Sequence, residues 1–337
     1  MKDYEVGVRV YNLDQCKGFI KKLVYEDSKK IEILEQIYSD KVVSIPQSTH
    51  DIIIRLFRHF DKQISNITPI KKYILLTNTL RLAKNSALFI NNLEKNTKIK
   101  VYDQTPIDSM EMIVLSIKNN LKFDPNKKII DTNNFILMNF AQNKIYFGGI
   151  SPEFEGLDFY TEDFSSLALE NFIKKSVLIY SPFKRKSVNP IGKENAQKTV
   201  NYYKMYLEQK FPVNFNKKLS AEENSNKKQT KFTQYINKQI KKVKKPKDQT
   251  LILTGDMLLS NLKIINIRDG WIRKDHLLKG IEKYSEYQDK KLISNDARFA
   301  VINLIILHGL LNQMGFEKAY LLPSNSEEGF ILHSKFN

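Results

Sequence analysis

The sequence predicts a mixed α/β protein with two domains, and three observations lead to this prediction. The chain has 337 residues, more than a single hydrophobic core usually serves. Strand-like and helix-like segments alternate through its first third, and a second round of alternation begins near Asn134. We expect an N-terminal domain of residues 1–122, completed by 322–337, and a C-terminal domain of residues 123–321.

The first third contains short apolar runs separated by amphipathic segments. Val6, Val8 and Val10 alternate as on one face of a strand, and Ile52, Leu56 and Phe60 fall on one stripe of a helix. The predicted strands are Tyr4–Tyr11, Lys71–Leu76 and Ile99–Tyr102, and the predicted helices are Ser48–Ile64, Asn85–Leu93 and Asp108–Ile117.

The second round opens with two strands joined by a short turn, FILMNF and KIYFGG. Further along, LILTG reads as a buried strand, and the segment from Phe299 to Met314 is the most apolar helix of the chain. The other elements expected here are helices at Gln197–Lys210 and Arg273–Tyr287 and a closing strand at Ala319–Leu322.

The charge of the chain favours a polyanionic partner. Lysine and arginine number 54 against 37 acids, a net charge of +17. Residues 216–248 hold eleven lysines and few large apolar side chains, so we expect a solvated insertion there. The alternative is a coding bias, because the whole chain is rich in Lys, Asn and Ile.

Composition also indicates where the protein works. The only cysteine, Cys16, cannot form an internal disulfide, and the first residues lack the pattern of a secretory signal. No apolar run reaches the length of a membrane span. We therefore expect a cytoplasmic protein with no membrane partner.

Common catalytic motifs are absent from the sequence. The five histidines do not form an HExxH or a Cys/His metal spacing. The sequence also lacks a GxxxxGK[ST] loop, a GxGxxG turn after a strand and a GxSxG elbow. Zinc-peptidase, P-loop, dinucleotide-binding and α/β-hydrolase chemistry are thereby disfavoured.

One segment resembles a family signature. LTNTLRLAKNSALFI, residues 76–90, is similar to the A-T-x-x-L-R-x-A-x-N-x-x-x-F signature of the exopolyphosphatase / guanosine pentaphosphate phosphohydrolase (Ppx/GppA) family. Weaker echoes follow in the family's order, with SLAL for S-L-P-L-G, LILTGD for its G-T-G-G strand and loop, and SEEGFIL for L-R-E-G-L-L.

The resemblance implies an actin-like (ribonuclease H-like) fold, with two β/α domains facing a cleft. In this fold, glycine-rich turns surround phosphate with backbone N–H groups. Members of the family release terminal phosphate from polyphosphate or guanosine pentaphosphate, with a glutamate as general base and a divalent cation as helper. Mg²⁺ would accordingly be required only if this chain is active.

The sequence departs from the family at the positions that should bind phosphate. Residues 9–14 read RVYNLD where the family has D-x-G-S-N-S, so that Arg9 stands for an aspartate and Tyr11 for a glycine. Residues 137–142 read LMNFAQ in place of D-I-G-G-G-S. Asp256 follows Thr254 and Gly255 in the third loop, and puts an acid where phosphate would lie.

Five residues remain as candidates. Asp108, in TPIDSMEM, lies at or beside the position of the catalytic base. The candidates for binding substrate are Arg81, Thr77, Thr254 and Gly255. Arg81 is the best candidate for a phosphate contact because guanidinium binds phosphate oxygens in pairs, although it could instead be a structural ion-pair partner.

Three hypotheses follow. In the first, the protein is a catalytically impaired homologue that binds polyphosphate, a guanosine nucleotide or a partner protein such as an active paralogue or a second copy of itself. In the second, it is an active exopolyphosphatase with a remodelled cleft and Asp108 as base. In the third, the lysines between Lys217 and Lys247 bind polyanions in a salt-dependent way, with nucleic acid not expected as the ligand.

Overall fold

The computed structural model describes the chain in segments. The longer segments are residues 4–12, 15–22, 28–32, 74–76, 83–122, 130–141, 144–150, 158–162, 164–178, 187–210, 249–255, 261–265, 269–292 and 297–336. Shorter pieces are residues 44, 45, 47, 50, 51, 53–55, 58, 81, 124, 258 and 267. The lysine-rich insertion expected at 216–248 lies outside the described residues.

The chain forms two compact units. Unit 1 is Met1–Ser116 with Ser326–Asn337, and unit 2 is Ile117–Asn325. The first boundary falls inside helix α4 (Pro106–Leu121), whereas the sequence places it at residue 122. The second boundary falls at the start of helix α11 (Ser326–Phe336), after the expected residue 322.

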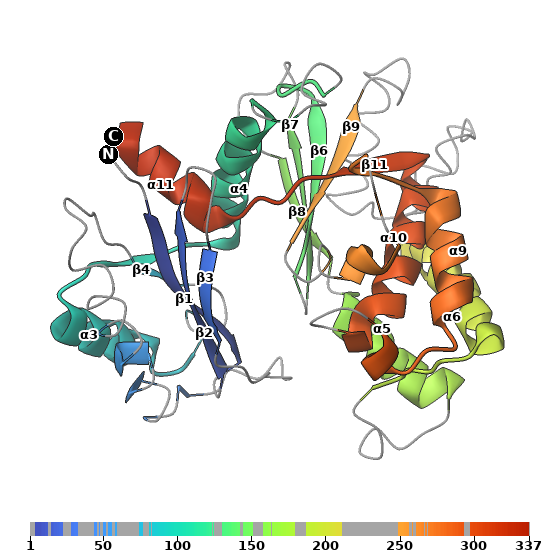
Figure 1. Ribbon diagram of the computed structural model, residues 1–337, viewed down its shortest axis with the longest axis horizontal. Coiled ribbons are helices and arrows are strands. Elements are labelled where there is room, and N and C mark those ends of the chain that lie inside the picture. The colour runs from blue at the N-terminus through green and yellow to red at the C-terminus, as the bar shows by residue number, and fades with distance from the viewer. Residues whose placement is uncertain are drawn as a thin grey trace, which may run out of the picture. The chain divides into compact units, whose positions relative to one another are not determined.

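Unit 1 begins with an antiparallel sheet in the order β1-β2-β3, drawn in blue in Figure 1. The predicted strand Tyr4–Tyr11 is confirmed as β1. A parallel pair of short strands, β4 and β5, follows, with helix α3 between them in the chain. The bounds are β1 Tyr4–Asn12, β2 Gln15–Lys22, β3 Ser28–Glu32, β4 Ile74–Leu76, α3 Ser86–Thr97 and β5 Val101–Asp103.

Asn85 positions the start of α3. Its side-chain Oδ1 accepts a hydrogen bond from the backbone N–H of Ile45 (2.7 Å), and its Nδ2 donates to the carbonyl of the same residue (2.9 Å). Phe89 and Leu93 of α3 are buried below this contact. The predicted helix Asn85–Leu93 is confirmed and extends to Thr97, while the helix predicted at Ser48–Ile64 is seen only at its described residues, between 47 and 58.

The last helix of the chain, α11, packs directly on α4 within unit 1. A Cβ added at Gly329 would lie 1.7 Å from the carbonyl oxygen of Met112, so the two helices meet at the glycine's backbone. Beside this crossing, the Ser116 hydroxyl donates to Glu328 Oε2 at 2.6 Å. Both side chains are buried, so the contact holds residues 326–336 to the N-terminal unit.

Unit 2 is built on one mixed sheet in the order β10-β11-β9-β6-β7-β8. β6, β9 and β11 run parallel, and the remaining neighbours pair antiparallel. The FILMNF, KIYFGG and LILTG strands are confirmed. The bounds are β6 Phe135–Phe140, β7 Ile145–Ile150, β8 Asp158–Glu162, β9 Thr250–Thr254, β10 Trp271–Arg273 and β11 Lys318–Leu321.

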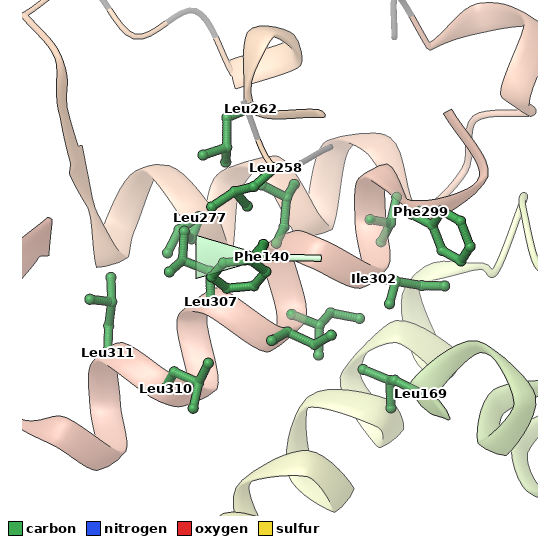
Figure 2. Close-up of a cluster of buried hydrophobic side chains, with 14 of the residues drawn as sticks. Phe140, Leu169, Leu258, Leu262, Leu277, Phe299, Ile302, Leu307, Leu310 and Leu311 are labelled. Atoms are coloured by element: carbon green, nitrogen blue, oxygen red, sulfur yellow. The ribbon is translucent and has the colours of Figure 1, made fainter. Parts of the chain in front are cut away.

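Helices of unit 2 gather around α10 (Ala300–Met314), beside the sheet in Figure 1. Figure 2 shows Ile302, Leu307, Leu310 and Leu311 of α10 in one buried cluster with Phe140 from the end of β6 and with Leu169 and Leu277. The surrounding helices are α5 Ser166–Phe172, α6 Lys193–Lys210 and α9 Lys274–Tyr284, and a π-helical turn, Ile173–Val177, follows α5.

By length and composition, the segment around α10 could cross a membrane, so the expectation that no apolar run reaches that length was wrong. Residues 297–314 satisfy that test, but 78% of the segment is buried inside the protein. Gly309 lets Tyr203 of α6 approach α10, since an added Cβ would lie 2.6 Å from the tyrosine ring. The segment is therefore accounted for as the central core helix of unit 2.

Replacement of Gly329 by alanine should destabilise unit 1. The new Cβ would collide with the backbone of α4, which cannot move aside as a side chain could, so we expect a loss of about 1–3 kcal/mol in unfolding free energy. Urea denaturation measures this loss. The control is His333→Ala on the exposed side of the same helix, and an equal effect of the two changes would refute the tight crossing.

Two buried histidines should make the protein less stable in mild acid. Burial lowers the pKa of His50, against the opposing effect of Asp51, and burial followed by the charge of Lys274 lowers that of His308. Each folded-state pKa lies below the unfolded value of about 6.5, so the unfolded state takes up protons first as the pH falls. The stabilisation is complete above that value and is lost as the pH drops towards the folded pKa.

Urea unfolding midpoints at about pH 7.5 and about pH 5.5 test this expectation. The urea midpoint should be lower at the acidic pH than at the neutral pH. The decrease should be smaller in His308→Gln, because the glutamine side chain stays neutral. A His308→Gln variant with the full pH dependence of the wild type would show that His308 does not contribute.

Candidate functional site

Thr254 and Gly255 lie at one edge of the unit 2 sheet. Thr254 ends β9 and pairs in register with Asn139 of β6. Because β6, β9 and β11 run parallel, their carboxyl ends meet at the same edge, where ligands of α/β folds usually bind. We call Asn139–Ala141, Thr254–Gly255 and Leu322–Ser324 the carboxyl edge of unit 2.

The hydroxyl of Thr254 is already used by the protein. It donates to the backbone carbonyl of Ser324 at 2.8 Å and accepts from the N–H of the same residue at 3.3 Å. The side chain is fully buried. Thr254 therefore ties the end of β9 to the segment after β11, and binding phosphate would require breaking both hydrogen bonds.

Gly255 is required by a close backbone approach. Its φ is +110°, a conformation that residues with a Cβ rarely adopt. A Cβ there would also lie 2.4 Å from the carbonyl oxygen of Phe140. Gly255, which matches a glycine in the family's third loop, thus has a packing role at the end of β6.

The segment that aligns with the family's second loop is a buried strand. Leu137 to Phe140 pair with β7 on one side, and Leu137 to Asn139 pair with β9 on the other, so their backbone groups belong to the sheet ladders. A short hairpin turn follows, in which the N–H of Ala141 donates to the carbonyl of Lys144. The described part of this segment therefore offers no run of free N–H groups to a phosphate.

The first-loop segment of unit 1 is likewise part of a hairpin. Arg9 pairs with Lys17, and the pairing of β1 with β2 continues to Asn12 opposite Gln15. Only residues 13 and 14 separate the two strands, and they lie outside the described residues. The backbone from Arg9 to Asn12 thus runs as a strand where the family's motif has a phosphate loop.

The unit 1 candidates follow the parallel strands β4 and β5. Leu76, the last residue of β4, pairs with Asp103, the last residue of β5, so both strands end at one edge. Thr77 comes next after β4 but lies outside the described residues. We call Arg81 and Asp103–Asp108 the carboxyl edge of unit 1.

Asp108 caps helix α4. Its Oδ2 accepts from the backbone N–H of Thr105 (2.8 Å) and from the hydroxyl of Thr105 (2.6 Å). In return, the Thr105 hydroxyl oxygen accepts from the N–H of Asp108 at 3.2 Å. This is a reciprocal capping box, in which Pro106 begins the helix, so the local structure gives Asp108 a role that does not involve catalysis.

Arg81 has a looser environment than the other described candidates. Its Nε lies 3.7 Å from Oδ1 of Asp103, which is within ion-pair range but too long for a hydrogen bond. The same Nε is buried and has no hydrogen-bond partner within the described part of the chain. Asp103 and Thr105 were not selected from the sequence, although T-x-x-D after a predicted strand is a visible capping signal.

The structure brings Arg81 and Asp103–Asp108 to one edge, and Thr254 and Gly255 to another edge in the other unit. A metal ion has no evident ligand set among the described residues, since they contain no group of three His, Cys, Asp or Glu side chains that could hold one.

The fold is that of the actin-like proteins, with α/β structure in two units and a mixed sheet flanked by helices in unit 2. Solved structures of Ppx/GppA proteins match the chain over its whole length. The Aquifex aeolicus family member has a TM-score of 0.64 at 13% identity, covering 100% of this chain and 98% of that one. An exopolyphosphatase from Cytophaga hutchinsonii ATCC 33406 has a TM-score of 0.61 at 10% identity, covering 98% and 97%.

A further A. aeolicus structure, the type II variant of the Ppx/GppA phosphatase, has a TM-score of 0.63 at 10% identity, covering 98% of this chain and 99% of that one. No protein-family model matches the chain, and no curated protein matches its sequence. At these identities the likeness establishes the fold, which confirms the actin-like fold class implied by the resemblance.

Replacement of Thr254 by valine should destabilise unit 2 because Ser324 would lose its partner at both backbone groups. We expect a loss of about 1–3 kcal/mol, measured by urea denaturation. Thr254→Ser keeps the hydroxyl and is the matched control. If Thr254→Val proved as stable as Thr254→Ser, the hydroxyl would not be the anchor described above.

Proposed function

We propose that this chain is a Ppx/GppA-family protein with impaired catalysis, which acts by binding polyphosphate, a guanosine nucleotide or a partner protein. The main support for the proposal is that the candidate groups already make structural contacts within the protein. Thr254 bonds to Ser324, Gly255 packs on Phe140, and Asp108 caps α4. The full-length likeness in fold supports the family, and the order of the sequence echoes agrees with it.

The expected loss of activity is large. Removal of one group that stabilises the charge of a transition state typically lowers the rate ~10²–10³-fold. Here the segments that align with the family's first and second phosphate loops run as strands. In the third loop, the hydroxyl of Thr254 is buried and already bonded to Ser324. Several such losses together leave little catalysis.

Binding is better supported than turnover because Arg81 keeps a group that can serve a ligand. A guanidinium can contact two phosphate oxygens at once, and the Arg81 side chain is 25% exposed although its Nε is buried. A single arginine gives an anion a contact but supplies neither a base nor a cradle of N–H groups. This arrangement suits a protein that holds a phosphate ligand without cleaving it.

Phosphate release from long-chain polyphosphate with Mg²⁺ tests the proposal. We expect turnover at least ~10³-fold below that of an ordinary family enzyme assayed in parallel. Binding of polyphosphate, followed by calorimetry, should weaken in Arg81→Ala. Turnover equal to that of the active enzyme, and abolished by Arg81→Ala, would refute impaired catalysis.

An active exopolyphosphatase with Asp108 as base is the second candidate function, and Asp108→Asn distinguishes it. In our proposal this change weakens the capping box by about 1 kcal/mol and leaves any residual phosphate release unchanged. In the alternative it removes activity while the fold persists. Release assays and thermal unfolding of the same preparation separate the two outcomes.

A third candidate function is salt-dependent binding of polyanions through the lysine-rich insertion. The net charge of +17 and the eleven lysines of residues 216–248 favour it. Deletion of these residues would abolish the salt-dependent binding of polyanions. Any binding of phosphate that depends on Arg81 would remain. We further propose that the protein works in the cytoplasm, as a homodimer or with a paralogue.

A further inference from the structure

Arg81 and Asp103 form an ion pair at the carboxyl edge of unit 1. Asp103 ends β5, and its side chain is 52% exposed, whereas that of Arg81 is 25% exposed. The pair is therefore open to solvent on the aspartate side. An anion that binds through Arg81 would lie close to this carboxylate.

The contact between the two side chains is made by charge and not by a hydrogen bond. The 3.7 Å between Nε and Oδ1 exceeds the 2.7–2.9 Å of charge-assisted hydrogen bonds. A bond of that kind would fix the geometry of both groups. Because the contact is this long, separating the carboxylate from the guanidinium breaks no hydrogen bond at Nε.

The neighbouring acid, Asp108, does not compete for the guanidinium in the same way. Its carboxylate accepts two hydrogen bonds from Thr105 and belongs to the cap of α4. Among the described residues, Asp103 is the acid that forms an ion pair with Arg81. The two carboxylates of this edge thus have different roles.

We propose that Asp103 is an internal competitor for Arg81, which lowers the affinity of the protein for phosphate anions. The carboxylate occupies the guanidinium when no ligand is present, and any anion that binds through Arg81 must displace it. Asp103 is therefore a residue that sets affinity and does not touch the reacting bond. The inference rests on the proposed function, in which Arg81 contacts phosphate.

The size of the effect follows from Coulomb's law. Two unit charges at this separation in a watery environment interact strongly enough to change a binding constant roughly five-fold. Asp103→Asn keeps the shape of the side chain and removes its charge. We therefore expect this variant to bind a phosphate anion roughly five-fold more tightly than the wild type.

Calorimetric titration with inorganic tripolyphosphate, at low and constant ionic strength, tests the proposal on the full chain. The variants are Asp103→Asn, Asp103→Ser, Arg81→Ala and the double change at both positions. Asp269→Asn is the matched control, because Asp269 forms an exposed pair with Arg273 in unit 2 and loses the same charge. Circular dichroism verifies that each variant is folded. If Asp103→Asn does not fold, Asp103→Ser replaces it as the variant that lacks the carboxylate.

The expected result is tighter binding in Asp103→Asn, no comparable change in Asp269→Asn, and weak binding in both variants that lack Arg81. Unchanged affinity in Asp103→Asn, with binding still dependent on Arg81, overturns the competitor role and leaves the proposed function standing. Equal tightening by Asp269→Asn also overturns it, since net charge would then explain the gain. Full binding in Arg81→Ala refutes the site in both proposals.

Discussion

Parallel pairing of strands is the constraint on which the rest of the structure depends. β4 runs parallel to β5 in unit 1, and β9 runs parallel to β6 and β11 in unit 2. Because parallel strands end at the same edge, segments distant in the sequence meet there, such as Thr254 and Ser324. Once they meet, their polar groups need partners, and the partners come from the protein itself. The same constraint that would assemble a phosphate site has here assembled structural contacts.

Much of the fold could be predicted from the sequence because the signals were local. The periodicity of apolar residues gave the strands FILMNF and LILTG and the long helix that became α10. The resemblance near residues 76–90 rested on residues that build the fold. Asn85 holds the backbone of Ile45, and Ala83 and Phe89 are buried. A signature of this kind predicts the fold well because its residues take part in packing and in backbone hydrogen bonds.

The candidate site was harder to predict because its chemistry depends on partners distant in the sequence. From the sequence, Thr254 is a candidate for binding phosphate through its hydroxyl. In the structure that hydroxyl is hydrogen-bonded to Ser324, seventy residues later in the chain. Asp108 could have been recognised as a cap from the TPID pattern alone. The pairing of Arg81 with Asp103 joins residues after two different strands, and only the register of β4 with β5 brings them together.

The crossing of α11 on α4 has a consequence for how the protein is made. Unit 2 is continuous in the chain, whereas unit 1 needs residues on both sides of it, and Gly329 meets Met112 only after every residue of unit 2 has been synthesised. Translation proceeds from the amino end at about 5–20 residues per second. The amino-terminal segment must therefore wait for roughly 200 further residues, on the order of ten seconds or more, before α11 can dock. During that interval the face of α4 that α11 covers in the folded protein lacks this partner.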